Sequence, residues 1–307
     1  MSILSSIFLG LVQGISEFLP ISSSGHLSLF QTFFGLTGTE DDMFFDVLLH
    51  LGTLISIFVY YRREIWSLIR ELGRLIMTLF GSGGKERKRP DGGEREGRGS
   101  DARDRRRSGK SAGRKPGLTT ESRVILMILV GTLPLFLVLP LKDKVESLYG
   151  NTLFIGCALI ATGAILFFSD RMARGRKTAR NATLLDALLV GVAQALAVVP
   201  GLSRSGTSIS AGMLRGFQRT FAVRFSFLLS IPAVLGANII SIKDAVEAGI
   251  DPSRLPAYIV GAAVAAVSGY FAIRLVNILA GKGKFGSFAF YCWGVGAAAL
   301  AATLIFR

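Results

Sequence analysis

The amino-acid sequence predicts an all-α polytopic membrane protein with an inverted-topology repeat, comprising two re-entrant helix pairs and six transmembrane helices. Half of its 307 residues are hydrophobic and the mean hydropathy is +0.49, which is more apolar surface than one soluble core can hide. Two similar polar motifs lie inside apolar segments about 180 residues apart, and the charges of the connecting segments alternate along the chain. We expect a single membrane domain over residues 1–307.

The first polar motif lies in residues 9–29, which carry Gln13, Glu17, three serines and a histidine in an apolar background. An ionisable side chain at membrane depth costs about 2.5 kcal/mol or more, so Glu17 is the first candidate for a functional role. The apolar segments 2–18 and 22–35 are each short, because a membrane span takes about 20 residues. They predict a re-entrant helix pair, whose broken backbone needs protein or a wet cavity around it.

A second copy of this motif begins at Gly191. Aligned on residues 10–26, residues 191–207 place Gln194 on Gln13, Ser203 on Ser22, Arg204 on Ser23, Ser205 on Ser24 and Gly206 on Gly25. A weaker similarity follows each copy, at residues 45–53 and 225–233. Broken hydrophobic segments at corresponding places in two halves indicate a binding site at the repeat interface, near the bilayer midplane.

Six further apolar segments are candidates for membrane spans. They cover residues 43–61, 122–141, 151–169, 221–242, 255–279 and 286–306. Residues 62–121 and 170–181 are basic whereas residues 37–46 are acidic, and short cytoplasmic loops favour Lys and Arg. This alternation holds along the chain only if residues 183–219 enter and leave on the cytoplasmic side, as a second re-entrant pair. Both termini are then expected outside the cytoplasm.

A basic, Gly-rich segment interrupts the first repeat. Residues 81–117 hold 13 Lys and Arg against 6 Asp and Glu, which is half of the net charge of +14. We expect residues 82–117 to form a disordered cytoplasmic linker, with attraction to anionic lipid headgroups as an alternative and without a nucleic-acid partner. The two repeats then comprise residues 1–81 with 118–169, and residues 183–307.

The residue types in the two motifs favour phosphate chemistry. In a helix over residues 9–18, Gln13 and Glu17 project from one face, just before a serine-rich turn. Hydroxyls and clustered backbone N–H groups at a helix start can hold an oxyanion or a phosphate, and Arg204 adds a planar fork of donors that suits phosphate. These groups fit phosphoryl transfer on a membrane-borne phosphate ester. A transporter that binds an anion at the broken helices would explain the same residues equally well.

Both motifs resemble those of a known enzyme family. Gln-Gly-Ile-Ser-Glu-Phe-Leu-Pro-Ile-Ser-Ser-Ser-Gly-His (residues 13–26) and Pro-Gly-Leu-Ser-Arg-Ser-Gly-Thr-Ser (residues 200–208) are similar to the signature motifs of the undecaprenyl-diphosphate phosphatases of the bacitracin-resistance type. The resemblance covers nearly the whole chain apart from the basic segment. It implies a plasma-membrane enzyme that hydrolyses a polyprenyl diphosphate to the monophosphate and inorganic phosphate, so that the carrier lipid is reused in cell-wall or glycan synthesis. Its active site is expected to open to the extracytoplasmic side.

The resemblance also implies roles for individual residues. The implied catalytic residues are Glu17, Ser23, His26 and Arg204. The implied phosphate-binding residues are Gln13, Ser22, Ser24, Gly25, Ser203, Ser205, Gly206, Thr207 and Ser208. Ser23 and His26 both fit the turn as the nucleophile, and we favour Ser23. His50, on an apolar span, is expected to be a core histidine outside the site.

The first motif also bears on whether a metal ion binds at Glu17, and the repeat bears on alternative functions. The neutral amide of Gln13 disfavours a metal bridged by two carboxylates, whereas a divalent cation, Mg²⁺ or Ca²⁺, held by Glu17 and the substrate phosphates fits the motif. No organic cofactor is expected. The alternatives to a phosphatase are a polyprenyl-phosphate flippase, an anion transporter and a non-catalytic lipid-binding scaffold, and the repeat itself is typical of transporters.

Overall fold

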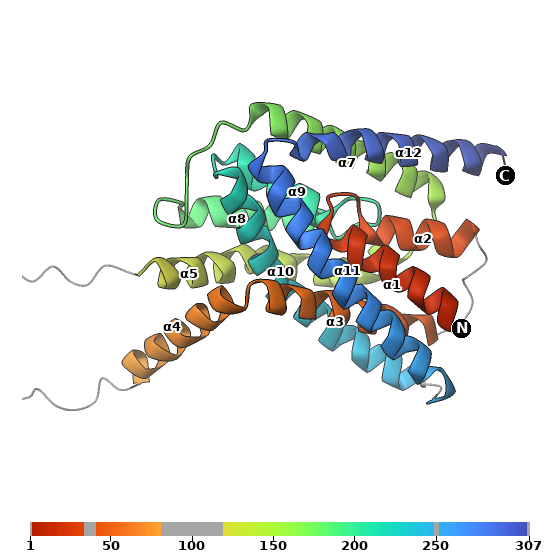
Figure 1. Cartoon of the computed structure of the whole chain (residues 1–307), viewed down its shortest axis with the longest axis horizontal. Coiled ribbons are helices and arrows are strands. Elements are labelled where there is room, and N and C mark those ends of the chain that lie inside the picture. Colours follow the sequence, from red (N-terminus) through yellow and green to blue (C-terminus); the bar gives the residue numbers. More distant parts are fainter. Residues whose placement is uncertain (1, 34–40, 81–118, 249–251, 306–307) are drawn as a thin grey trace, which may run out of the picture.

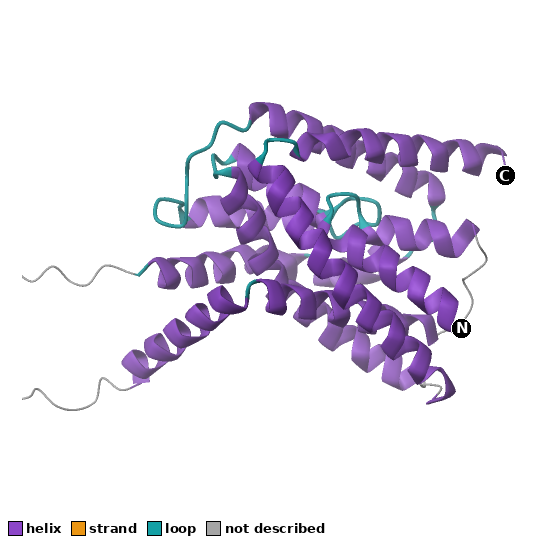
Figure 2. Ribbon diagram, in the orientation of Figure 1, coloured by secondary structure: helices purple, strands orange, loops and turns teal. Residues whose placement is uncertain are grey.

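The computed structural model describes residues 2–33, 41–80, 119–248 and 252–305 (Figure 1). Nearly all of these residues are helical, and an isolated bridge between Lys177 and Phe217 is the only extended pairing in the described ranges (Figure 2). The α-helices are α1 (Ile3–Phe18), α2 (Ser23–Phe33), α3 (Asp41–Tyr60), α4 (Arg62–Phe80), α5 (Thr120–Thr132), α6 (Lys142–Glu146), α7 (Thr152–Met172), α8 (Leu184–Leu196), α9 (Arg204–Leu214), α10 (Arg219–Ala248), α11 (Leu255–Gly281) and α12 (Phe288–Ile305). Short 3₁₀ helices occupy Leu133–Leu137, Leu139–Leu141, Pro252–Arg254 and Phe285–Ser287.

Five helical stretches are long and apolar enough to cross a membrane. They are Thr120–Glu146, Thr152–Met172, Arg219–Lys243, Pro252–Gly281 and Phe285–Ile305. A sixth span is obtained when α3 and α4, which meet at an angle of 85°, are taken together. The expectation of an all-α, multi-pass membrane protein is therefore confirmed, and the five stretches overlap five of the expected spans.

Two regions differ from the expectation. Residues 62–80 were expected within a basic connecting segment, but they form α4, an amphipathic helix that the charge pattern concealed. The expected span 122–141 is α-helical only to Thr132, because Pro134 and Pro140 lack the N–H that an α-helix requires and the chain continues in 3₁₀ turns. The expected linker, residues 82–117, lies outside the described residues.

Two short apolar helices, α1 with 16 residues and α8 with 13, are each packed along a helix of a membrane-spanning stretch. α1 lies along α11, and α8 lies along α5. These crossings are close, because a methyl group at Gly10 would overlap the Gly261 carbonyl and one at Gly191 would overlap the Gly131 backbone. Small residues are the usual means of bringing helices together in a membrane, where no hydrophobic force acts between them.

The chain breaks after each of these short helices, in the interior of the molecule. α2 and α9, of 11 residues each, follow the breaks. Phe18, at the end of α1, packs edge to face on Phe227 of α10 with ring centroids 5.4 Å apart, and both side chains belong to the main hydrophobic cluster. In Figure 1 the N- and C-termini lie at one end of the molecule, whereas α4 and the start of α5 lie at the other.

Candidate active site

The two breaks contain turns with the same hydrogen bonds. Ser22 Oγ accepts a hydrogen bond from the Gly25 N–H at 3.3 Å, and Ser203 Oγ accepts one from the Gly206 N–H at 3.1 Å. Both serines therefore cap the helix that follows. Ser22 has a φ of 70° and is the only non-glycine residue with a positive φ in the described chain. Such a backbone costs about 1 kcal/mol or more and is typical of functional sites.

Glu17 is the centre of the site and joins the two motifs. Its side chain is buried, with the residue 7% exposed. Oε2 accepts hydrogen bonds from Ser23 Oγ at 2.6 Å and from Gln13 Nε2 at 3.1 Å, while Oε1 accepts one from the Arg204 guanidinium. The expected meeting of the two motifs is therefore present in the structure, since Arg204 follows Glu17 by 187 residues in sequence.

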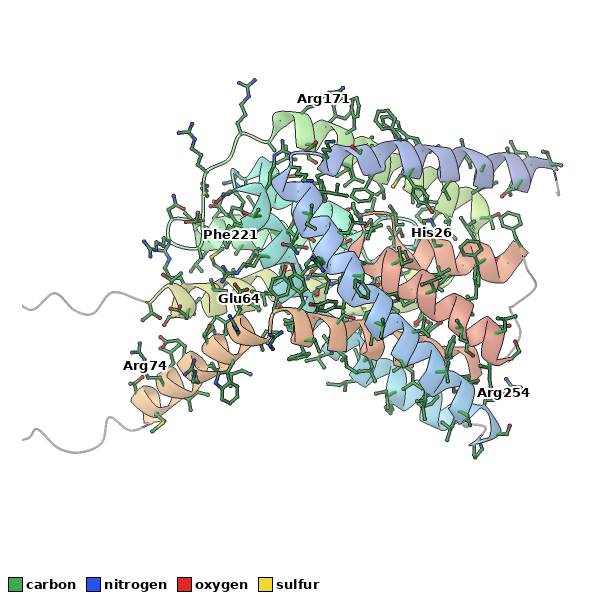
Figure 3. The ribbon with its side chains drawn as sticks, viewed as in Figure 1. His26, Glu64, Arg74, Arg171, Phe221 and Arg254 are labelled. Atoms are coloured by element: carbon green, nitrogen blue, oxygen red, sulfur yellow. The ribbon has the colours of Figure 1, made fainter. Side chains whose placement is uncertain are left out.

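His26, the alternative nucleophile, lies on α2 (Figure 3), and its hydrogen bonds are made with residues other than Ser23. Its Nδ1 is 2.7 Å from the Ser22 carbonyl oxygen and its Nε2 is 2.9 Å from the Tyr291 hydroxyl. A carbonyl can only accept, so Nδ1 carries the proton and Nε2 accepts from Tyr291. The two rings are also stacked, with centroids 5.6 Å apart. Both nitrogens of His26 are thus engaged away from Ser23.

The expectation that His50 lies outside the site is wrong. His50 Nε2 is 3.9 Å from Glu17 Oε2, within ion-pair distance of the central carboxylate. Its Nδ1 is 2.8 Å from the Asp46 backbone oxygen, which holds the ring in this orientation. Because the side chain is 36% exposed, the imidazole stands at the border of the site. Tyr291 and His50 both contact residues of the site, and the motifs indicated neither.

A cavity of about 40 Å³ lies between the two turns. Its lining residues are Ser16, Glu17, Ser22, Ser23, Ser24, Ala197, Leu202, Ser203 and Arg204. A larger cavity lies elsewhere, but this small one contains the acid, the hydroxyls and the guanidinium, so it is the candidate active site. Both motifs contribute to it, and a diphosphate requires more room than it offers.

The other expected phosphate-binding residues stand behind this cavity. Gly25 faces the Gly201 backbone, and Gly206 faces Pro20. Gln13 touches Glu17 from within α1. Three further hydroxyls do not face the cavity. Ser205 donates a hydrogen bond to the Leu19 carbonyl, and the Ser208 hydroxyl is hydrogen-bonded to the Ser226 hydroxyl. Thr207 Oγ1 is buried and has no hydrogen-bond partner in the described chain.

The site does not form a protein cage for a divalent cation. No group of three or more His, Cys, Asp or Glu side chains converges among the described residues, and Ca²⁺ takes six to eight oxygen ligands. Both Glu17 oxygens already accept hydrogen bonds from neighbouring side chains. A cation at this carboxylate would depend on substrate phosphates and water for most of its ligands.

The fold and this junction define a multi-pass membrane protein in which a buried acid, a hydroxyl and a guanidinium meet at two broken apolar segments. The chain matches the family model described as bacitracin resistance protein BacA over residues 6–91 and 98–298. It therefore belongs to the BacA family, and the resemblance seen in the two motifs is confirmed.

Curated relatives agree with this assignment over nearly their whole length. The chain is 39% identical to the undecaprenyl-diphosphatase of Carboxydothermus hydrogenoformans, with 96% of this chain and 95% of the relative covered. It is also 39% identical to that of Methanosphaera stadtmanae, with 96% of each covered. The undecaprenyl-diphosphatase of Alkaliphilus metalliredigens is 35% identical, over 99% of this chain and the whole relative.

Proposed function

We infer that this chain hydrolyses undecaprenyl diphosphate to undecaprenyl phosphate and inorganic phosphate, which returns the carrier lipid to cell-wall or glycan synthesis. Membership of the BacA family and the names of the relatives support this reaction. The observation in the site that carries it is the 2.6 Å hydrogen bond from Ser23 Oγ to Glu17 Oε2, beside the guanidinium of Arg204. A nucleophile, a base and a phosphate-binding cation thus stand in one small volume.

The proposed mechanism begins with attack by Ser23. Its oxygen forms a bond to the terminal phosphorus, the bond from that phosphorus to the bridging oxygen breaks, and Glu17 takes the serine proton. Undecaprenyl phosphate leaves with the proton that Glu17 took from the serine, so the carboxylate is regenerated. Water then attacks the phosphorus of the phosphoserine as Glu17 takes a proton from that water, and inorganic phosphate departs as Glu17 returns this proton to the serine oxygen. Arg204 compensates the charge that develops on the phosphate oxygens.

Arg204 also controls the base in this mechanism. Without substrate its guanidinium is paired with Glu17, which makes the carboxylate a weak proton acceptor. A diphosphate offers Arg204 a bidentate partner of higher charge. When the guanidinium turns to the phosphate, Glu17 loses its counter-charge next to Ser23 and becomes a stronger base. Substrate binding is thereby coupled to activation of the nucleophile.

The alternative nucleophile, His26, is less well placed. Its Nε2 lone pair is occupied by the Tyr291 hydroxyl at 2.9 Å, so attack by this nitrogen would first require the loss of that bond. We assign His26 the role of holding the start of α2, through its bond to the Ser22 carbonyl at 2.7 Å. A divalent cation held by Glu17 and the substrate phosphates remains part of the proposal.

We also propose that the fold is an inverted repeat with two re-entrant pairs, made of residues 1–81 with 118–169, and residues 183–307. Reciprocal contacts support it. Gly25 faces Gly201 and Gly206 faces Pro20, and in the alignment of the motifs Pro20 falls on Gly201 and Gly25 on Gly206. The two contacts are thus one contact made in both directions, as a two-fold axis generates. The helix contacts are reciprocal too. If α1 of the first repeat corresponds to α8 of the second, and α5 to α11, the contact of α1 with α11 corresponds to the contact of α8 with α5.

The active site is proposed to open to the extracytoplasmic side, with both termini on that side. Cysteine labelling in intact cells tests this orientation, in a Cys157→Ser background because Cys157 is exposed while Cys292 is buried. A cysteine at Ser147 should react with an impermeant reagent, and one at Arg174 only after permeabilisation. The reverse pattern would invert the topology.

Phosphate release in detergent micelles tests the reaction itself. Hydrolysis needs no sealed compartment, whereas a flippase or an anion transporter produces no phosphate from undecaprenyl diphosphate. Ser23→Ala should lower kcat/KM about a hundredfold or more, and Ser67→Ala on α4 is the matched control. If Ser23→Ala retains more than about a tenth of the activity while His26→Ala is inactive, the nucleophile is His26.

A further inference from the structure

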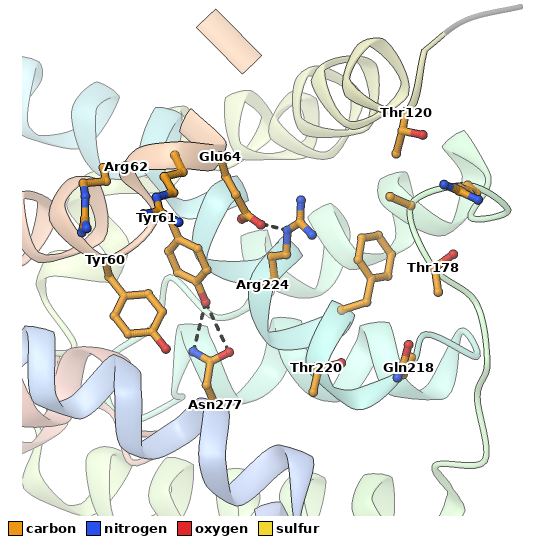
Figure 4. Close-up of a pocket in the computed structure, with 14 residues that line it drawn as sticks. Tyr60, Tyr61, Arg62, Glu64, Thr120, Thr178, Gln218, Thr220, Arg224 and Asn277 are labelled. Carbon is orange, nitrogen blue, oxygen red and sulfur yellow. Dashed lines mark hydrogen bonds and ion pairs between the residues drawn. The ribbon is translucent and has the colours of Figure 1, made fainter. Parts of the chain in front are cut away.

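A second cavity, of about 700 Å³, lies where α3 turns into α4 (Figure 4). It is bounded by the starts of α5 and α10, by α11 and by the segment between α7 and α8. None of its lining residues lines the candidate active site. In Figure 3, Glu64 and Phe221 of this cavity lie toward the end of the molecule from which α4 projects, and His26 of the active site lies toward the termini. The two cavities are therefore separate sites.

Positive charge dominates the walls of this cavity. Four arginines line it, Arg62, Arg63, Arg180 and Arg224, and Glu64 is its one carboxylate in the described chain. Glu64 is already paired, since its Oε2 is 2.8 Å from Arg224 Nε (Figure 4). The walls thus carry a surplus of three positive charges, and guanidinium groups bind phosphate through paired N–H donors.

Neutral donors and a rigid wall complete the cavity. Three threonine hydroxyls line it, from Thr120, Thr178 and Thr220. On the opposite wall Asn277 Nδ2 donates to the Tyr61 hydroxyl at 3.0 Å, and the Tyr60 and Tyr61 rings meet edge to face with centroids 4.8 Å apart. Tyrosines are typical of the level at which a membrane meets water. An anion in this cavity would therefore lie at headgroup depth.

The helix that begins at this cavity has an apolar stripe suited to lipid chains. Exposed apolar side chains on α4 are Trp66, Ile69, Leu72, Ile76 and Met77. At 100° per residue they fall on one side of the helix, opposite Glu64, Glu71 and Arg74, with Arg70 at the edge of the stripe. A helix with this pattern lies in the membrane interface with its apolar side against acyl chains. Arg62 and Arg63, at its first turn, belong to the cavity.

We propose that this cavity binds the phosphate of an anionic lipid carrying a phosphomonoester headgroup, with the acyl chains against α4. A phosphomonoester carries up to two negative charges, which matches the surplus of guanidinium groups better than a singly charged phosphodiester does. Glu64 partly fills the place of that phosphate, so binding exchanges the Arg224–Glu64 pair for an Arg224–phosphate pair. The site is independent of the proposed hydrolysis and of the active-site residues.

The test uses the full-length protein in neutral detergent, with dioctanoyl phosphatidic acid in mixed micelles as the lipid probe and inorganic phosphate as the soluble probe. Calorimetric titration is done in an Arg204→Ala background, so that the active site adds little phosphate affinity. Arg180→Gln with Arg224→Gln should weaken lipid binding at least tenfold, and Glu64→Gln should strengthen it about threefold, because the competing carboxylate is gone. Arg70→Gln, an exposed arginine of α4 outside the cavity, is the control and should change binding less than twofold.

Separate outcomes identify the bound group. Tighter binding of phosphatidic acid than of inorganic phosphate or phosphatidylglycerol supports the lipid phosphomonoester, whereas inorganic phosphate binding at least as tightly overturns the lipid assignment. Equal binding by parent and double variant, or an equal loss in Arg70→Gln, overturns the site. Should the double variant unfold, the exposed single variants Arg63→Gln and Arg180→Gln are each expected to weaken binding about threefold.

Discussion

The two short helix pairs, α1–α2 and α8–α9, have the same serine–glycine hydrogen bond at their breaks but carry different reactive groups. In each pair a serine accepts from the N–H of the glycine three residues later, and a second serine hydroxyl lies 3.3 or 3.4 Å from the first. The reactive positions differ, since Glu17 and Ser23 of the first pair align with Val198 and Arg204 of the second. The serine–glycine hydrogen bond is present in both pairs, whereas the acid lies in the first pair and the guanidinium in the second. The site therefore exists only where the two pairs meet.

This division also stabilises the junction. A buried charge without a partner is costly in apolar surroundings, and Glu17 is 7% exposed. The first pair supplies the acid and the second supplies its counter-charge in Arg204. Removal of either charge leaves the other poorly compensated, which ties the folding of the junction to its chemistry.

The pairs differ again in how their first helices begin. α8 starts with a capping box, in which Thr183 and Asp186 bond each other's backbone, and Asp186 also pairs with Lys177 at 2.8 Å and Arg215 at 2.9 Å. Although burial opposes ionisation, the hydrogen bonds from Lys177, Thr183 and Arg215 lower the pKa of Asp186 to about 2. α1 has only a cap from Ser2. The pair that carries Arg204 is therefore the more firmly anchored.

The largest effect is expected from removing the charge that the second pair contributes. Arg204→Ala should lower kcat/KM about a hundredfold or more, roughly 3 kcal/mol, because the substrate phosphates lose their nearest cation. Arg204→Lys should recover only part, since an ammonium lacks the bidentate fork. The double variant with Ser23→Ala should be little worse than the poorer single one, because groups that act as one unit are not additive.

Steady-state phosphate release by the purified variants measures these losses, with thermal unfolding as the folding control. Arg171→Ala, which removes an arginine stacked on Phe167 rather than on the site, should stay within about twofold of the parent. An active Arg204→Ala variant would show that the two pairs do not form one site.

A smaller effect, on stability rather than chemistry, is expected at the anchor of the second pair. Asp186→Asn should lower the free energy of unfolding by about 1–2 kcal/mol, because Lys177 and Arg215 lose their counter-charge yet remain partly solvated. Since the pKa of Asp186 is about 2 in the folded protein and ordinarily 3.8, the carboxylate's contribution to stability is complete above about pH 4 and is lost as the pH falls toward 2.

Thermal unfolding of parent and Asp186→Asn across this pH range measures that difference. It should be full at pH 5 and shrink as the solution is acidified, while activity per folded molecule is retained. A difference that grows on acidification would contradict the anchoring role of the carboxylate.

Tyr291→Phe should lower kcat about fivefold, which corresponds to the roughly 1 kcal/mol of one hydrogen bond. The change removes the donor to His26 Nε2 and keeps the stacked ring, so it tests the positioning of α2. Tyr270→Phe is the matched control. A rise in activity would instead mean that the freed Nε2 is the nucleophile, because Tyr291 would then have been blocking it.

The smallest effect is expected at the aligned glutamines. Gln13 Nε2 donates to Glu17, whereas both amide atoms of Gln194 are buried without a partner in the described chain. An unpaired buried amide is unfavourable by about 1–3 kcal/mol, so Gln194→Met should leave activity unchanged and stability equal or higher. Gln13→Met should lower activity severalfold. Equal losses in phosphate release for both variants would mean that the two glutamines have equivalent roles.

The meeting of Glu17 and Arg204 could be predicted from the sequence, because repeated motifs at helix breaks place corresponding turns at one interface. His50 could have been predicted by the same reasoning as Glu17, because it too is an ionisable group in an apolar segment, but it was assigned to the core instead. Nothing in the sequence around Tyr291 indicated a place in the site. A tyrosine in an apolar span is common, and its bond to His26 across 265 residues depends on where α12 packs.

The helix α4 was missed for a different reason. Its charges and its place beside the basic segment favoured a loop, and the apolar stripe emerges only at a spacing of 3.6 residues. The four arginines of the second cavity come from three separate parts of the chain. No local pattern brings such residues together, because their meeting depends on the packing of α4, α10 and the segment before α8.

The small volume between the two turns limits what can bind there while the turns are closed. A space of about 40 Å³ holds a few water molecules, so a diphosphate can occupy it only while the turns are apart. The turns touch through backbone where Gly25 lies against Gly201, and the Ser205 hydroxyl also joins them by donating to the Leu19 carbonyl. A diphosphate bound at this junction would therefore need the turns to separate and close again, and such movements take microseconds to milliseconds in enzymes.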